Sequence, residues 1–158
     1  MDLEANRRVV AAAPQLLAER LPGVTDVIPG YSNLLVEFDP QVVSRERLQA
    51  RLRRLLAERP PPAATSKVVN LSVVYDGPDL AELAAAVGLE PIEVIRRHSS
   101  VRYRAYAAGF TPGFAYLGPV DPAIRAPRRQ RPRELVPAGS VGIADGQTGV
   151  YPLASPGG

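Results

Sequence analysis

VPAGSVGIADGQTGVYPLASPGG, residues 136–158, contains six glycines that separate short apolar pieces. Glycine weakens an ordinary strand, and it is used where the backbone takes a positive φ or where another chain or a ligand approaches closely. The stretch is therefore interpreted as a surface made of short strands and turns rather than as one core strand. Its polar side chains are small hydroxyls, one amide and one phenol: Ser140, Thr148, Ser155, Gln147 and Tyr151.

Residues 110–158 as a whole carry few helical signals and most of the proline and glycine of this half. That composition predicts short strands joined by ordered loops, as in a small β-barrel. Within it, GFTPGFAYLG (109–118) sets three aromatic residues, Phe110, Phe114 and Tyr116, beside turn glycines and a proline. Such a loop either forms the wall of a binding pocket or fills the core, and both alternatives stay open.

A basic segment, PRRQRPR (127–133), precedes the glycine-rich stretch. Its prolines argue against a helix, so the arginines do not share a helical stripe. The planar guanidinium is a good partner for carboxylate and phosphate. Arg128, Arg129 and Arg133 are therefore candidates for contact with an anionic substrate, and the alternative is a solvated surface.

His98 is the only histidine in the chain. It ends the predicted helix PIEVIRRH, where cations are favoured by the helix dipole, and it precedes two serines. Neighbours in sequence rarely form a catalytic pair, and the chain has no G-x-S-x-G motif. His98 is therefore either a hydrogen-bonded residue at a helix end or a catalytic group.

The first half of the chain predicts the order helix, strand, strand, helix. The helix runs over residues 3–21 with Asp2 as N-cap and a kink or division at Pro14, and VTDVI and NLLVEF are the strands. The second helix begins at Ser44, and three prolines at 60–62 open a linker. KVVNLSVVY (67–75) is then predicted to be a strand. The order is ferredoxin-like with its first strand absent.

Two domains are expected, residues 1–62 as an α+β domain and residues 63–158 as a mainly β domain, with the strand at 67–75 as a possible completion of the first. Two short helices open the second domain, one capped by Asp79 and closed by Gly88, the other starting at Pro91.

Composition limits the function classes. The chain has 158 residues, 46% hydrophobic and 22% charged, as in a globular protein. It has no apolar run of membrane-spanning length and no signal-peptide pattern, so a cytoplasmic protein with no membrane partner is expected. Without cysteine, and with one histidine, no metal site is expected. Residues 96–158 carry a formal charge of +6 and residues 67–95 one of −4. The basic residues lack interleaved aromatics, so no nucleic-acid partner is expected.

The C-terminal half, HSSVRYRAYAAGFTPGFAYLG followed by APRRQRPRELVPAGSVGIADGQTGVYPLASPGG, closely resembles the bacterial 5-oxoprolinase B-subunit family, also called allophanate hydrolase subunit 1. DLEANRRVV and LLVEFDP match more loosely. The resemblance implies a ferredoxin-like N-terminal domain and a cyclophilin-like β-barrel. Members of the family have a further strand before the first match and run on past PGG, so the resemblance also implies that strands are absent here at both ends and that the barrel is incomplete.

The resemblance further implies a homologous C subunit as partner, and a third subunit, in the ATP-dependent opening of 5-oxo-L-proline to L-glutamate. ATP with Mg²⁺ serves the complex, and no cofactor is expected to bind tightly to this chain. Two alternatives come with the family: inhibition of a sensor histidine kinase, and a carboxyltransferase-type role in allophanate or urea metabolism.

One site hypothesis joins the resemblance to the residues. His98 and Gln147 are the catalytic candidates. The substrate-binding candidates are the aromatic, basic and hydroxyl residues named above: Phe110, Phe114, Tyr116, Arg128, Arg129, Arg133, Ser140, Thr148 and Tyr151. Lactam opening builds negative charge on the carbonyl oxygen, which arginines or glycine-loop N–H groups can stabilise. The hypothesis places these groups around a single pocket.

Overall fold

The computed structural model describes residues 2–58 and 67–157. Two compact units, Met1–Val69 and Asn70–Gly158, make up the chain. Both contain helices and antiparallel sheets, so the fold is mixed α/β. The linker and the boundary predicted between residues 62 and 63 lie outside the described residues.

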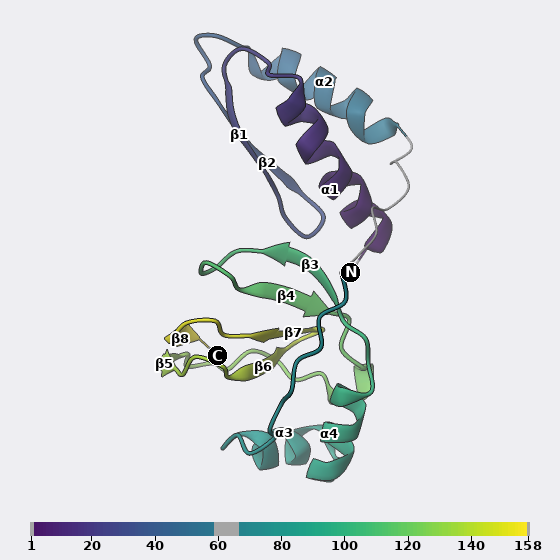
Figure 1. Cartoon of the computed structure of the whole chain (residues 1–158), viewed down its shortest axis with the longest axis vertical. Helices are drawn as coiled ribbons and strands as arrows, with labels where there is room; N and C mark the ends of the chain where they lie inside the picture. Colours follow the sequence, from purple (N-terminus) through teal and green to yellow (C-terminus); the bar gives the residue numbers. More distant parts are fainter. Residues whose placement is uncertain (1, 59–66, 158) are drawn as a thin grey trace. The chain divides into compact units, whose positions relative to one another are not determined.

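The first unit has the predicted order of helix, strand, strand, helix (Figure 1). Its elements are α1 (Leu3–Ala18), β1 (Val24–Pro29), β2 (Leu34–Phe38) and α2 (Arg45–Ala57). Asp2 caps α1 by accepting hydrogen bonds from the amides of Glu4 and Ala5, and Ser44 caps α2. Pro14 lies inside α1 without dividing it, contrary to one of the two outcomes predicted for it. The helix holds together because proline removes only one helical hydrogen bond and the same turns are packed into the core.

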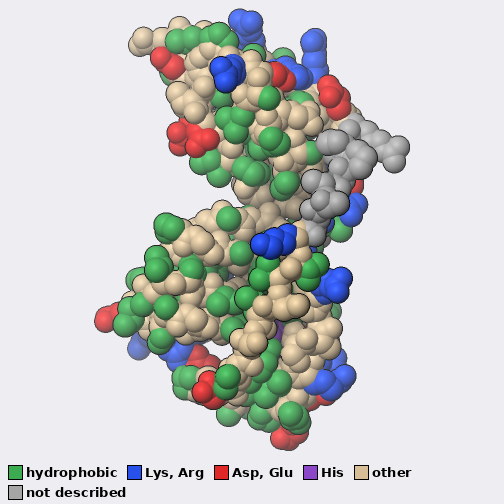
Figure 2. Space-filling model, viewed as in Figure 1, with side chains coloured by type: hydrophobic (Ala, Val, Ile, Leu, Met, Phe, Trp, Pro, Cys, Tyr) green, Lys and Arg blue, Asp and Glu red, His purple; other side chains and the backbone are tan. Residues whose placement is uncertain are grey.

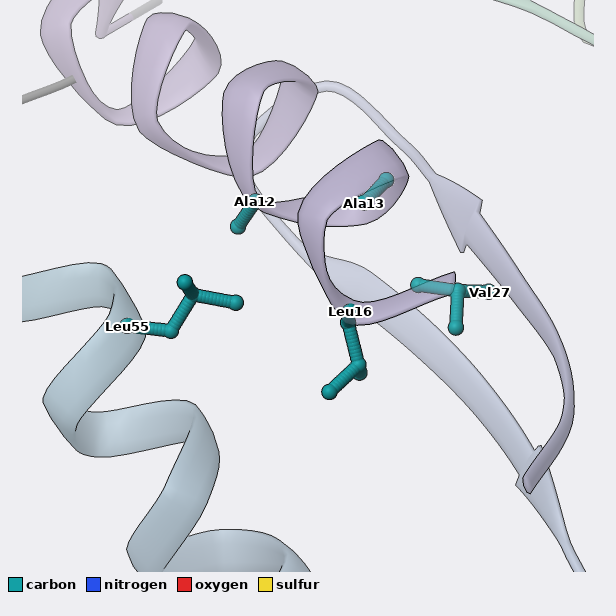
Figure 3. Packing of buried hydrophobic residues seen from close by; sticks show 5 residues of the cluster. All are labelled: Ala12, Ala13, Leu16, Val27 and Leu55. Carbon is teal, nitrogen blue, oxygen red and sulfur yellow. The ribbon is translucent and has the colours of Figure 1, made fainter. Parts of the chain in front are cut away.

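The core of the first unit forms where both helices meet the hairpin. Figure 3 shows Ala12, Ala13 and Leu16 of α1 converging with Val27 of β1 and Leu55 of α2. Leu16 is fully buried, and Val27 pairs with Val36 across the antiparallel β1–β2 ladder. The unit therefore has a hydrophobic core made only of its own residues.

The strand predicted at 67–75 is not formed: the segment runs as irregular chain. Its apolar side chains are largely exposed, with Val69 at 65% and Val74 at 81%. β-branched residues favour a strand only where a neighbouring strand supplies the ladder and the packing. Among the described residues no strand pairs with this segment, so it does not complete the sheet of the first unit.

The second unit opens with two short helices and continues in short strands, as predicted (Figure 1). Gly88 closes the first helix in the left-handed conformation with φ 69°. Antiparallel pairing builds a four-stranded sheet, β3-β4-β7-β6, and a two-stranded one, β5-β8. The elements are α3 (Leu80–Val87), α4 (Pro91–Ser99), β3 (Arg104–Ala108), β4 (Ala115–Gly118), the 3₁₀ turn η1 (Pro122–Ile124), β5 (Arg133–Val136), β6 (Val141–Ala144), β7 (Gln147–Val150) and β8 (Ser155–Gly157).

The four-stranded sheet has two different faces. Ile143 of β6 packs against the core cluster of Ala84, Val94, Val120 and Ile124, which comes from α3, α4 and the chain around η1. We call this side the helical face. Successive residues of a strand point to opposite sides of the sheet. Gly142, next to Ile143, and Gly149, which pairs with Gly142, therefore face the opposite side from Ile143. That second side carries aromatic rings, and we call it the aromatic face.

Candidate functional site

The aromatic face is organised around Phe114, which is 8% exposed. Its ring centroid lies 5.5 Å from that of Phe110, 5.0 Å from that of Tyr116 and 5.4 Å from that of Tyr151, in edge-on arrangements. Edge-on pairs at these distances are favourable because the positive ring edge meets the negative ring face. Residues predicted to wall a pocket are thus brought together in one cluster.

Glycines allow two of the rings to lie directly against strands, Phe114 against β7 of the four-stranded sheet and Tyr151 against β8 of the two-stranded sheet. A Cβ added at Gly149 would come 2.6 Å from Cζ of Phe114, and one added at Gly157 would come 2.9 Å from Cζ of Tyr151. Real Cβ atoms essentially never make such contacts, so a side chain at either position would force Phe114 or Tyr151 to move. The excess of glycine in residues 136–158 is explained in part by this close approach of rings to backbone.

Phe110 is the outermost ring of the cluster. It is 57% exposed, and its backbone takes a left-handed conformation with φ 69°, which is rare for a bulky residue. The loop that holds it is closed by hydrogen bonds from the amide of Gly109 to the carbonyl of Phe114 and from the amide of Phe114 to the carbonyl of Thr111. Strained backbone of this kind gathers at binding and catalytic sites. An aromatic ring held exposed in such a loop is the part of this face most accessible to a ligand.

His98 lies on α4 and is 6% exposed. Its Nδ1 is 2.7 Å from the Tyr75 hydroxyl, and its Nε2 is 2.9 Å from Oγ1 of Thr148. Burial lowers the pKa of His98 below its ordinary value. At neutral pH the ring is therefore uncharged, and both of its nitrogens are occupied by hydroxyl groups.

The structure separates His98 from the aromatic cluster. Thr148, which contacts His98, pairs with Ile143 and shares the helical face, whereas Gly149 next to it faces Phe114. The two predicted groups therefore lie on opposite sides of β7 rather than around a single pocket. Gln147, two residues before Gly149, faces the aromatic side.

Ser140 lies in the turn before β6, where its carbonyl accepts a hydrogen bond of 2.9 Å from the amide of Tyr151. Its backbone thereby holds one of the aromatic residues in place. Contact of Ser140, Gln147 and Thr148 with substrate stays a prediction.

Two of the three candidate arginines are paired with acids. Arg133 makes a bidentate pair with Asp79, and Arg129 contacts Glu82 at 2.9 Å. The hydrogen bond from Arg133 holds the pKa of Asp79 below its usual range. Asp79, predicted as a helix cap, makes no capping hydrogen bond with its side chain because the carboxylate faces these arginines instead. Within residues 2–58 and 67–157, Arg128 is exposed and makes no ion pair.

Residues that the sequence did not indicate as site residues contact His98 and the candidate arginines. Tyr75 and Tyr103 surround His98, and the Tyr103 hydroxyl donates to the His98 carbonyl at 3.0 Å. Asp79 and Glu82 pair with Arg129 and Arg133 of the basic segment. The opposite formal charges of residues 67–95 and 96–158 were a signal for that pairing. No pattern in the sequence indicated the two tyrosines as partners of His98.

The described part of the chain brings no three acidic, cysteine or histidine residues together as a metal site. Its helices are too short or too polar to cross a bilayer. On the face shown in Figure 2, lysine and arginine side chains stand at separate places rather than in one patch.

Comparison with curated proteins finds relatives over the whole chain. The family model "Carboxyltransferase domain, subdomain C and D" matches residues 1–158. The chain is 46% identical over 162 residues to the B subunit of 5-oxoprolinase from Escherichia coli O157:H7, covering 100% of this chain and 73% of that protein. It is 39% identical to the protein of the same name from Bacillus subtilis (strain 168), covering 98% of this chain and 70% of that protein.

Solved structures share the fold of this chain. The crystal structure of TTHA0988 is 47% identical with a TM-score of 0.83, and the match covers 99% of this chain and 31% of that one. This chain therefore spans under a third of that protein. The match to the urea amidolyase of K. lactis, at 17% identity and a TM-score of 0.77, covers 100% of this chain and 11% of that one, and it shows similarity of fold alone.

Proposed function

Because the chain belongs to the 5-oxoprolinase B-subunit family of carboxyltransferase domains, we propose that it acts as the B subunit of a multi-subunit 5-oxoprolinase. The reaction breaks the ring C–N bond of 5-oxo-L-proline and adds water to give L-glutamate. We assign ATP-dependent activation of the lactam to the complex.

The observation that carries a role for this chain is the exposed ring of Phe110 beside Phe114 and Tyr151. A five-membered lactam is small and nearly flat, and aromatic rings offer it apolar contact without competing for its polar groups. We propose that the aromatic face contacts the ring of the substrate in the assembled enzyme. Arg128, which is exposed, is the candidate partner for the substrate carboxylate.

The proposal extends to architecture and partners. We infer that the two units correspond to the ferredoxin-like and cyclophilin-like domains of the family, and that the C subunit and a third subunit join this chain in the cytoplasm. The curated relatives are named as the B subunit of 5-oxoprolinase, which supports a complex of several subunits.

An omission experiment tests the function. The chain is co-expressed with homologues of the C subunit and of the third subunit, and ATP-dependent release of glutamate from 5-oxoproline is measured with and without it. We expect turnover only when all three are present. Equal turnover without this chain would refute the proposal.

A carboxyltransferase role is the second candidate, and the family model over residues 1–158 favours it. The same purified complex is offered urea and a carrier domain whose biotin has been carboxylated beforehand. Transfer of the carboxyl group from carboxybiotin to urea to give allophanate, without glutamate release from 5-oxoproline, would assign the chain to that class. Inhibition of a histidine kinase stays a prediction of the family resemblance.

A further inference from the structure

A continuous line of hydrogen bonds crosses the helical side of the second unit. It runs from the Tyr75 hydroxyl to Nδ1 of His98 at 2.7 Å, from Nε2 of His98 to Oγ1 of Thr148 at 2.9 Å, and from Thr148 to the carbonyl of Gly142 at 2.9 Å. These residues come from the segment before α3, from α4, from β7 and from β6. Four parts of the sequence are thus joined by one set of polar contacts.

The chemistry of the groups gives this line a direction. A carbonyl oxygen only accepts, so the single hydroxyl proton of Thr148 is donated to Gly142. Oγ1 of Thr148 must then accept from His98, which places the imidazole proton on Nε2. In a neutral imidazole the other nitrogen is an acceptor, so Nδ1 receives the proton of the Tyr75 hydroxyl. Every donor and acceptor in the line is satisfied by this one arrangement.

The surroundings of the ring favour the neutral form as well. Tyr75 from the segment before α3 and Tyr103 from the chain before β3 pack against it, with ring centroids 5.7 Å and 5.2 Å away. Among the described residues, neither ring nitrogen of His98 contacts a carboxylate that would stabilise an imidazolium. A buried imidazole with hydroxyl partners on both nitrogens is fixed in orientation and poorly placed to exchange protons with a substrate.

We propose that His98 is a positioning residue, held as the neutral Nε2–H tautomer, that fixes the β6–β7 hairpin from the helical side. Gly142 and Gly149 of that hairpin carry the aromatic rings on their other side. His98 therefore acts on the substrate surface through the backbone and not by proton transfer, and this part of the inference rests on the proposed function. The hydrogen-bond direction itself does not depend on it.

Nitrogen NMR of the ¹⁵N-histidine-labelled chain tests the tautomer, because His98 is the only histidine and gives one set of signals. We expect Nε2 to be the protonated nitrogen and Nδ1 the acceptor, with a titration midpoint below the ordinary value of 6.5. A protonated Nδ1 in the neutral ring, or a mixture of tautomers, would overturn the proposal. This measurement needs no activity, so it fails or succeeds independently of the proposed function.

Two tyrosine variants test the direction of the hydrogen bond between Tyr75 and His98. Tyr75→Phe removes the donor to Nδ1, which destabilises the neutral form relative to the imidazolium, so the midpoint should rise. Tyr116→Phe removes a hydroxyl from the aromatic face and should leave it unchanged. Equal effects of the two variants would contradict the assigned direction.

Substitution of His98 separates positioning from proton transfer. Gln places an amide N–H near the position of Nε2 and keeps the bond to Thr148, whereas Leu keeps only the volume. In the assembled complex, His98→Gln should lose several-fold less kcat/KM than His98→Leu, and the loss in His98→Leu should be about tenfold or more. Equal and complete loss of kcat in both variants, with the aromatic face intact, would assign proton transfer to His98 and overturn the proposal.

Discussion

Replacement of Gly149 by Ala tests the close contact between the aromatic rings and the sheet. The added Cβ would lie 2.6 Å from Cζ of Phe114 and 3.2 Å from the carbonyl oxygen of Ala115. Phe114 is 8% exposed and is held by three other rings, so it cannot swing away without losing those contacts. The neighbouring carbonyl belongs to β4 and is also fixed.

Two opposing effects determine how much Gly149→Ala changes the free energy of unfolding. Ala in place of Gly lowers the entropy of the unfolded chain and stabilises by about 0.4–1 kcal/mol where the backbone permits it. Overpacking of a fixed site costs about 1–3 kcal/mol. We therefore expect Gly149→Ala to lower the free energy of unfolding of the second unit by about 1–2 kcal/mol, equivalent to a fall in Tm of roughly 5–10 °C.

Gly142 is the matched control because it pairs directly with Gly149 and faces the same side. A Cβ there would meet its nearest atom, Cε2 of Tyr151, at an ordinary 3.6 Å. Urea unfolding followed by tyrosine fluorescence should find Gly142→Ala within about 0.5 kcal/mol of the native chain. Phe114→Leu should relieve the clash in the Gly149→Ala background. If Gly149→Ala is as stable as Gly142→Ala, the description of the aromatic face is wrong.

Other perturbations address the first unit and the ionisable groups. Leu16→Ala, at a fully buried position, should cost about 2–5 kcal/mol in urea unfolding, whereas Leu17→Ala, 45% exposed, should cost well under half of that. Burial, with smaller contributions from neighbouring acidic groups, raises the pKa of Tyr103 to about 12. Stability from this group is fully present below pH 10 and is lost as the pH rises from 10 to about 12, and Tyr103→Phe should remove that alkaline loss in thermal melts. Asp79→Asn should cost less than about 1 kcal/mol because its pair with Arg133 is partly exposed. The lowered pKa of Asp79 contributes stability above pH 3.8 that is lost as the pH falls further, so the difference in stability between the two proteins should shrink only below that pH.

Local signals allowed the helices to be predicted. Asp2 and Ser44 stand at the starts of α1 and α2, and Gly88 ends α3, because caps satisfy backbone groups that each helix leaves open regardless of the rest of the fold. The segment at 67–75 could not be predicted in this way. Its residues favour a strand, but a strand exists only with a partner, and pairing is decided by chain that is remote in sequence.

The candidate site shows the same limit. The glycine-rich sequence correctly indicated short strands and turns that something approaches closely, but the structure shows that aromatic rings of this chain make the approach. What the sequence could not show is the register of β7, which turns Thr148 toward His98 and Gly149 toward Phe114. A shift of one residue would exchange the two faces, and only the paired strands determine it. The pairing of Asp79 with Arg133 was not predicted either, because the two residues are 54 positions apart and only the folded chain brings them together.

Kinetics of the Phe110→Ala variant test the central claim, that the aromatic face is the functional surface of this protein, most directly. Leu153→Ala serves as control, since Leu153 is 53% exposed and Phe110 57%. In the assembled complex with ATP, Phe110→Ala should lower kcat/KM for 5-oxoproline by about tenfold or more while the subunits still co-purify, and Leu153→Ala should not. Native kcat/KM in Phe110→Ala would contradict the account.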